Sequence, residues 1–166
     1  MKQDNRGTTL IELIVVIAIM AVLAGILINT TGFLTGKKAK DCAYRIIAAM
    51  SQVRNETMGK SKGGNDISLA IVQQGDEIYG RMDFKGTVSE VLLGKSGLMV
   101  VGYDSDGNQL PVEGSNELVY SFDRATGGLY DRKRISYYTT IVITEGNVSW
   151  RVTIEPITGR TAYERN

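Results

Sequence analysis

A single carboxylate, that of Glu12, lies near the start of an otherwise apolar run that extends from Leu10 to Ile28. A charged side chain inside a bilayer costs about 2.5–3.5 kcal/mol on insertion scales, so such residues rarely occur there without a partner. The chemistry open to Glu12 is therefore electrostatic pairing with a cation. Glu12 also lies in the first turns of its own predicted helix, where the helix dipole favours an anion.

The apolar run has the length of a membrane helix. At about 1.5 Å per residue, residues 10–28 extend about 28 Å, close to the roughly 30 Å thickness of the hydrocarbon core of a bilayer. A short polar head that carries Lys2, Asp4 and Arg6 precedes the run and ends at Gly7. The sequence therefore predicts a membrane helix with a short polar leader.

The segment Gly7-Thr8-Thr9-Leu10-Ile11-Glu12-Leu13-Ile14 resembles the class III leader and N-terminal helix of type IV prepilins and type II secretion pseudopilins. In that family a membrane aspartyl peptidase cuts after the glycine and methylates the new N-terminus. The resemblance implies cleavage between Gly7 and Thr8, N-methylation of Thr8, and subunit assembly through Glu12. In the family this glutamate meets the positive N-terminus of a neighbouring subunit, and a buried carboxylate is tolerated when it is paired in this way.

Two features depart from the family pattern. The family usually has phenylalanine or another large apolar residue where this chain has Thr8. Many members also have a proline about twenty residues into the mature helix, whereas residues 29–32 here read Asn-Thr-Thr-Gly and Gly36 follows. Any weak point in the helix would therefore arise from Gly and Thr, which are poor helix formers.

Two other interpretations of the N-terminus remain open. A Sec signal peptide would be cut after Ala24, since Val22-Leu23-Ala24 precedes Gly25. That interpretation explains Lys2 and Arg6 but gives Glu12 no role. A plain membrane anchor explains neither Gly7 nor its spacing from Glu12.

Composition excludes several kinds of site. The chain has 19 basic and 18 acidic side chains, and removal of residues 1–7 takes away two basic and one acidic, so the remainder is balanced. Such a balance does not predict a nucleic-acid binder. Histidine is absent and Cys42 is the single cysteine, which excludes Ser-His and Cys-His nucleophile pairs, histidine-based metal sites and an internal disulfide. Lys37, Lys38 and Lys40 follow the apolar run; by the positive-inside rule they oppose an exterior C-terminal domain, which the resemblance favours.

Apolar residues continue at three- and four-residue steps from Ala39 to Val53, which predicts an amphipathic helix that ends near Met58-Gly59. Combined with the apolar run, residues 9–59 are expected to form one long helix with a weak point at 29–36, and Cys42 is expected to be a buried, inert thiol. After Ile67 the period changes to two, and turn residues separate the strands. The expected strands are Ser68–Gln73, Glu77–Phe84, Thr87–Leu93, Leu98–Tyr103, Glu117–Phe122, Tyr137–Thr144 and Val148–Glu155.

These elements predict an α+β fold in which the long helix packs on an antiparallel β-sheet, because the apolar face of such a sheet needs a cover. The pilin resemblance implies the same architecture. The expected divisions are a leader (1–7), a transmembrane and assembly helix (8–31), its amphipathic continuation (32–59) and an exterior β-rich domain (60–166). A looser similarity to GspH/FimT minor pseudopilins rests on Gln52-Val53-Arg54-Asn55-Glu56 and on the terminal Thr158-Gly159-Arg160.

Other constellations are weak. Asp104-Ser105-Asp106-Gly107-Asn108 resembles the start of a calcium loop, but position twelve is Ser115 rather than glutamate, so a turn is the simpler interpretation. The carboxylates Glu113 and Glu117, or Asp123 and Asp131, have no spacing that distinguishes them from solvated residues. The aromatic residues of the strands are expected to be packing residues. The sequence predicts no enzyme, no metal site and no cofactor.

The sequence therefore predicts a structural subunit, a minor one, of a type IV pilus or a type II secretion-like pseudopilus. It would be a single-pass cytoplasmic membrane protein before it enters the filament. Its expected partners are the prepilin peptidase, other pilin or pseudopilin subunits, an assembly ATPase, a platform membrane protein and membrane lipid. A major pilin and a membrane-anchored or secreted β-rich binding domain are the alternatives.

Overall fold

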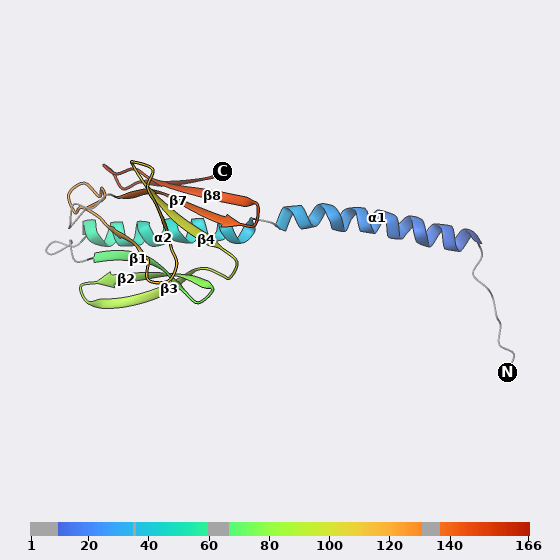
Figure 1. The fold of residues 1–166 in the computed structure, drawn as a ribbon, viewed down its shortest axis with the longest axis horizontal. Coiled ribbons are helices and arrows are strands. Elements are labelled where there is room, and N and C mark those ends of the chain that lie inside the picture. The colour runs from blue at the N-terminus through green and yellow to red at the C-terminus, as the bar shows by residue number, and fades with distance from the viewer. Residues whose placement is uncertain (1–9, 35, 60–66, 131–136) are drawn as a thin grey trace, which may run out of the picture. The chain divides into compact units, whose positions relative to one another are not determined.

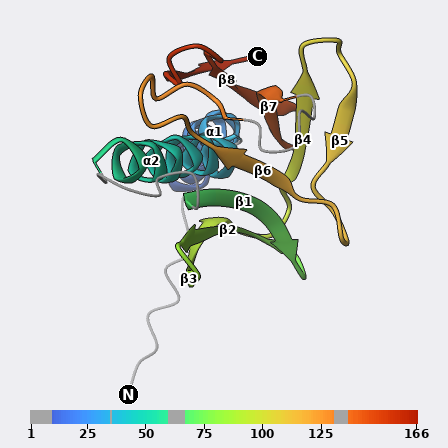
Figure 2. The same ribbon diagram turned by 90° about the vertical axis from the view of Figure 1, so that its left-hand side faces the viewer.

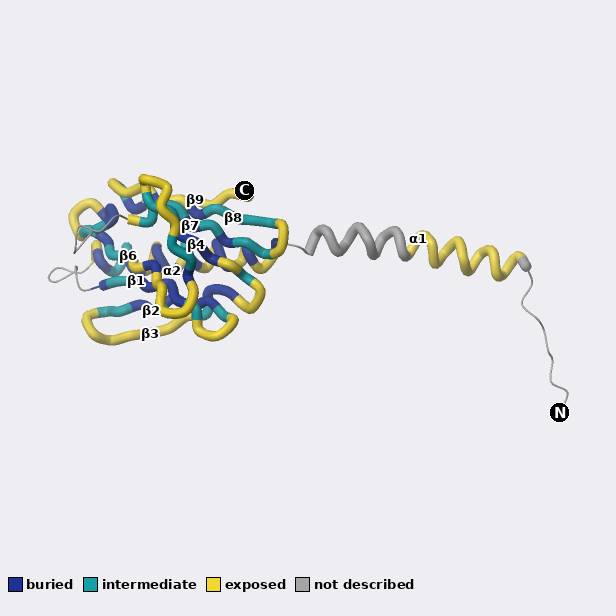
Figure 3. Tube along the Cα trace, viewed as in Figure 1, coloured by how far each residue is buried: buried dark blue, intermediate teal, exposed yellow. Residues whose placement is uncertain are grey.

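The computed structural model describes residues 10–34, 36–59, 67–130 and 137–166, and it describes the side chains of helix α1 from residue 11 to residue 23 (Figure 1). Contacts divide the chain into two units, Met1–Thr35 and Gly36–Asn166. The first unit holds α1 (Leu10–Leu34). Every described side chain of α1 is exposed, as the tube in Figure 3 shows for its first half.

Helix α2 (Lys37–Gly59) is the central element of the second unit. Its apolar residues recur every three or four positions, so they form one stripe, and that stripe is buried. The side chain of Ile46 is fully buried, and removing it to alanine at such a site costs about 2–5 kcal/mol. The buried positions of the helix are Ala39, Cys42, Ala43, Ile46, Ala49, Met50, Val53 and Thr57.

The first sheet is antiparallel, with strand order β3-β2-β1-β6. In β2, buried residues alternate with half-buried ones, as expected for a strand with one face on the core. In the paired strand β1, Leu69 lies opposite Met82 and both are buried. The strands are β1 (Ile67–Gln74), β2 (Glu77–Phe84), β3 (Thr87–Gly94) and β6 (Leu118–Ser121).

The second sheet is also antiparallel, with order β5-β4-β7-β8-β9. Its strands β7 and β8 form the hairpin that Glu145-Gly146-Asn147 predicted, with Glu145 opposite Val148. The apolar face of this hairpin includes the buried Ile143 and Val152. The strands are β4 (Met99–Asp104), β5 (Gln109–Pro111), β7 (Tyr138–Glu145), β8 (Val148–Ile154) and β9 (Thr161–Arg165).

Helix α2 contacts strands of both sheets and shares one hydrophobic core with them, as the end-on view of Figure 2 illustrates. Burial of each large apolar side chain in such a core stabilises the fold by about 1.5–3 kcal/mol. The α+β class and the packing of a helix on antiparallel strands are therefore confirmed.

The structure differs from the sequence-based prediction in three respects. The expected long helix is two helices, α1 and α2, and Gly36 between them, which has a positive φ of 88°, lies within the weak point expected at residues 29–36. The expected single sheet is two sheets. All seven expected strands are present, but β5 and β9 were not expected. Strand β5 has only three residues and ends in Pro111, which suits an edge strand, whereas three of the five residues of β9 are polar or charged.

Candidate functional site

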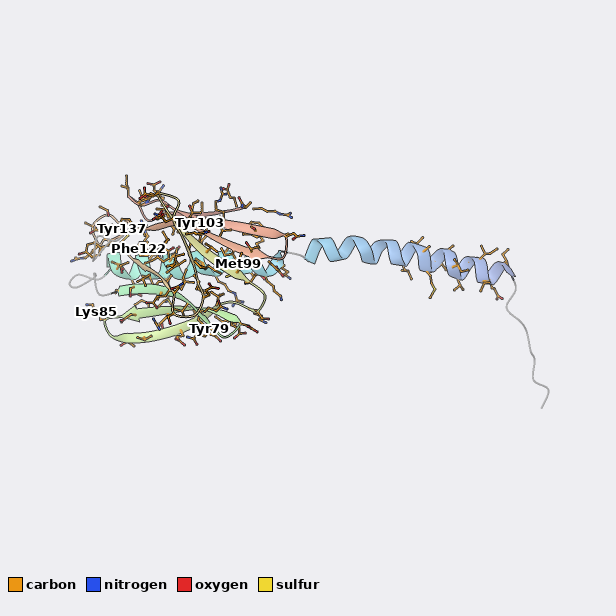
Figure 4. The ribbon with its side chains drawn as sticks, viewed as in Figure 1. Tyr79, Lys85, Met99, Tyr103, Phe122 and Tyr137 are labelled. Carbon is orange, nitrogen blue, oxygen red and sulfur yellow. The ribbon has the colours of Figure 1, made fainter. Side chains whose placement is uncertain are left out.

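Glu12 lies in the first turn of α1 and is exposed, among apolar neighbours that are exposed as well. Ile11 is 69% exposed and Val16 is 51% exposed. Figure 4 shows the side chains of this part of α1 as sticks that project from several sides of the helix. A helix with apolar side chains all round is normally covered by lipid or by other helices. Gly7 and Thr8, the predicted cleavage and methylation residues, lie outside the described residues.

The Asp104 loop is a hydrogen-bonded turn between β4 and β5. Asp104 Oδ1 accepts hydrogen bonds from the backbone N–H groups of Asp106 (2.9 Å) and Asn108 (2.8 Å), and its Oδ2 accepts one from Asn108 Nδ2 (2.9 Å). The hydrogen bond from the Asn108 side chain is the main cause that holds the pKa of Asp104 below its ordinary value. Among the described residues, no group of three or more carboxylate, cysteine or histidine side chains could hold a metal ion.

Two of the other carboxylates considered from the sequence, Glu117 and Asp123, take part in contacts that stabilise the fold. Glu117 Oε2 lies 2.6 Å from Arg81 Nη2 in a surface ion pair. Asp123 Oδ1 accepts hydrogen bonds from the N–H groups of Ala125 and Thr126 within a turn. Asp131 lies outside the described residues. Glu117 and Asp123 therefore each take part in a structural contact, as expected of solvated surface residues.

Two buried groups of the core have raised pKa values because burial disfavours their charged forms. Desolvation raises the pKa of the Cys42 thiol to about 12, against the opposing effect of Arg45. Cys42 is fully buried, so the expected burial of its thiol is confirmed, and its inertness stays a prediction. Burial also raises the pKa of Tyr120, whose hydroxyl has no hydrogen-bond partner among the described residues.

Arg54 joins the C-terminal part of α2 to two loops. Its Nε lies 3.0 Å from the carbonyl oxygen of Gly127 and 3.0 Å from that of Thr158, and it donates to both. We call Arg54, Gly127 and Thr158 the Arg54 junction. The segments 52–56 and 158–160, which carried the resemblance to GspH/FimT pseudopilins, therefore meet in the structure.

The two loops of the Arg54 junction are also held by their own backbone. In the first, Gly127 N donates to Asp123 O at 2.8 Å; in the second, Gly159 N donates to Glu155 O at 2.7 Å. A Cβ atom at Gly159, where φ is 64°, would overlap the carbonyl oxygen of Gly127. Because two backbone carbonyls accept from the Nε–H group of Arg54, the junction is a structural contact between α2 and the two loops.

The sequence could indicate Arg54 but not its partners. Arg54 and Gly127 are 73 positions apart in the chain, and Arg54 and Thr158 are 104 positions apart. Both acceptors are backbone carbonyls, which every residue type possesses, so no residue pattern identifies them. Glycine at positions 127 and 159 is the one local signal, since both have a positive φ.

Residues 2–28 match the family model described as the prokaryotic N-terminal methylation motif. This motif is the leader signature of type IV prepilins, so the predicted prepilin leader is confirmed. It supports a type IV pilin-like or pseudopilin subunit that is anchored in a membrane, processed by a prepilin peptidase and assembled with other pilin subunits. Proteins with this motif are structural rather than enzymatic.

No curated protein and no solved structure matched the chain. Within the described part of the chain, no helix is both long enough and apolar enough to cross a membrane. The membrane span expected over residues 8–31 stays a prediction.

Proposed function

We propose that this chain is a minor structural subunit of a type IV pilus or a type II secretion-like pseudopilus. The prepilin peptidase cuts after Gly7 and methylates Thr8, and the mature subunit enters the filament through its N-terminal helix. The observation that carries the proposal is the methylation motif over residues 2–28. Glu12, in the first turn of α1 among exposed apolar side chains, supports it.

In this function Glu12 pairs with the N-terminal amine of a neighbouring subunit. The amine is created by cleavage, so the charge pair forms only between processed subunits. Breaking a buried ion pair by removing one partner costs about 3–5 kcal/mol, because the other charge stays buried and unpaired. The globular unit then supplies the exposed surface of the filament, and the subunit performs no catalysis. The loose similarity of the Arg54 junction segments to GspH/FimT pseudopilins favours the minor over the major subunit.

The first test is the mass of the N-terminal peptide of the protein recovered from its native membranes. A peptide that begins at Thr8, with one added methyl group, is expected. A terminus at Gly25 would indicate a secreted domain and an intact Met1 a plain anchor, and either result would overturn the proposal.

The second test addresses the charge pair. Glu12→Ala should lower incorporation into filaments at least tenfold, while the urea midpoint of the globular unit stays unchanged. Glu113→Ala, which removes an exposed carboxylate from the globular unit, is the matched control and should assemble normally. A variant in which a substitution of Gly7 prevents cleavage keeps its leader and should lose filament incorporation to the same extent. Adding Glu12→Ala to that variant should lower its incorporation no further. Normal assembly of Glu12→Ala would remove the proposed role of Glu12.

A further inference from the structure

Strand β3 is an edge strand, and most of its length is open to solvent. Among the described residues, no strand lies beyond it in the order β3-β2-β1-β6. Residues 87–91 are all exposed. Val88 and Val91 point to opposite faces of the strand and are 54% and 37% exposed, so both faces are open. Beyond this part, the carbonyl oxygen of Leu92 accepts a hydrogen bond from Arg45 Nη1 of α2 at 2.9 Å. We call residues 87–91 the open segment of β3.

The open segment lacks the features that usually protect an edge strand. An edge presents unpaired backbone N–H and C=O groups, and proteins normally protect it with lysine, proline or a very short strand. Strand β3 has eight residues and contains neither lysine nor proline. Two other edges are short: β5 has three residues and ends in Pro111, and β6 has four. The backbone of the open segment is therefore available to a further strand, which is a common mode of recognition between chains.

Strand β9 is the free edge of the other sheet, and its residues 162–165 are exposed. Its Arg165 and the Glu90 of β3 carry opposite charges, and neither forms an ion pair within the described part of the chain. Arg81, which lies opposite Glu90 on β2, pairs with Glu117 instead. Figure 3 shows β3 and β9 on opposite sides of α2, so the two edges of one copy cannot pair with each other.

The two edges match in length and in charge. In a parallel register that puts Arg165 opposite Glu90, Tyr163 lies opposite Val88, and the five residues of β9 fall almost entirely on the open segment. Opposite-charge pairs and aromatic–β-branched pairs are the cross-strand pairs that stabilise sheets. An antiparallel register with the same ion pair would instead put Tyr163 opposite Leu92, whose carbonyl already accepts from α2. The parallel register therefore fits better.

We propose that strand β9 of a second copy of this chain adds in parallel to the open segment of β3, with Arg165 of the second copy paired to Glu90. The two surfaces differ, so the contact is heterologous and can repeat from one copy to the next. It joins globular units and rests on neither the leader nor α1. Its failure would therefore leave the proposed function unchanged, and failure of the proposed function would leave this contact unchanged.

The first test is disulfide cross-linking of full-length chains in detergent micelles. Glu90→Cys is mixed with Arg165→Cys, and a dimer that contains one chain of each kind is expected. Cys42 is buried, so wild-type chains mixed with either variant give the background. Glu113→Cys, which replaces an exposed carboxylate outside the strands, is the matched control for Glu90→Cys and should not rise above that background with Arg165→Cys. An equal yield of dimer from Glu90→Cys alone would indicate pairing of β3 with β3 and would overturn the proposal, as would the absence of any dimer.

A second pair of cysteines tests the direction of the added strand. The parallel register puts Ala162 of one copy opposite Thr87 of the other, and both positions are exposed. Thr87→Cys should therefore cross-link to Ala162→Cys. In the antiparallel register Ala162 would lie opposite Leu93, so that the two cysteines would be far apart. Failure of this pair to cross-link would overturn the parallel contact.

Charge reversal then tests the ion pair, with the rate of the Thr87→Cys to Ala162→Cys cross-link as the readout. Glu90→Arg in the first chain, or Arg165→Glu in the second, puts like charges opposite each other and should lower the rate about threefold to tenfold. The two reversals together should restore it. Glu113→Arg is the matched control and should leave the rate unchanged. Single reversals without effect, or a double reversal that restores nothing, would refute the pairing of Glu90 with Arg165.

Discussion

Substitution of Arg54 by alanine should destabilise the globular unit more than the same substitution at Arg45, the other arginine of α2. The lost hydrogen bond comes from a charged donor, and such bonds contribute about 1.5–3 kcal/mol. One N–H serves both carbonyl acceptors at 3.0 Å, so we count a single bond rather than two. The carbonyls of Gly127 and Thr158 lose that donor in a partly buried setting, which adds a desolvation cost. We expect a loss of about 3 kcal/mol in the free energy of unfolding.

Arg45→Ala is the matched control for this prediction. Arg45 is also an α2 arginine that donates to a backbone carbonyl, that of Leu92, at 2.9 Å, but it is exposed. Its loss should therefore cost about 0.5–1 kcal/mol. The assay is urea unfolding in detergent micelles, followed by the fluorescence of Trp150, which is the single tryptophan of the chain.

The difference in the free energy of unfolding between Arg54→Ala and Arg45→Ala tests whether the Arg54 junction holds the two loops to α2. If Arg54→Ala costs no more than Arg45→Ala, the Arg54 junction does not hold the two loops to α2, and the reasoning from its geometry is wrong. Arg54→Lys adds a further check. Lysine lacks the Nε–H group of the planar guanidinium that lies between the two carbonyls, so it should recover only part of the lost stability.

Two further outcomes follow from buried or hydrogen-bonded groups. Tyr120→Phe should leave the free energy of unfolding unchanged or raise it by up to about 1 kcal/mol, because it removes a buried hydroxyl that has no partner among the described residues; a loss above 1 kcal/mol in urea unfolding would contradict this. Hydrogen bonds from Thr126 hold the pKa of Asp123 below its ordinary value in the folded state, so its contribution to stability is present above pH about 4 and is lost as pH falls through the lower, folded pKa. Unfolding between pH 5 and pH 2 should therefore depend less steeply on pH in Asp123→Asn than in the wild type, and equal slopes would refute the assignment.

The hydrophobic pattern predicted the elements of the globular unit well. Segments in which apolar and polar residues alternate, with turn residues between them, correctly predicted seven strands. They could do so because the alternation of side chains is a local property of a strand. The pattern failed for β5 and β9. Tyr163 of β9 lies opposite Val152 of β8, with its ring centroid 5.6 Å from that of Trp150, so this strand is held by its neighbour rather than by its own composition.

The leader could be recognised because its information is contiguous. Gly7, Thr8 and Glu12 lie within six positions, and the peptidase and the assembly partner of a prepilin act on this short segment. The family match over residues 2–28 rests on the same stretch. The described structure adds the exposure of Glu12 on α1, but the recognition did not need it.

The sequence by itself therefore determined the prepilin leader, the two helical patterns and the α+β class, because each depends on residues that are neighbours in the chain. Only the tertiary structure decided how the strands divide into two sheets and what Arg54 and Glu145 contact. The physical reason is that these features depend on hydrogen bonds to backbone groups far away in the chain, and every residue offers such groups. In the sequence Glu145 is one polar residue of a hairpin turn. In the fold its Oε2 accepts hydrogen bonds from the backbone N–H groups of Lys38 and Ala39 at the start of α2.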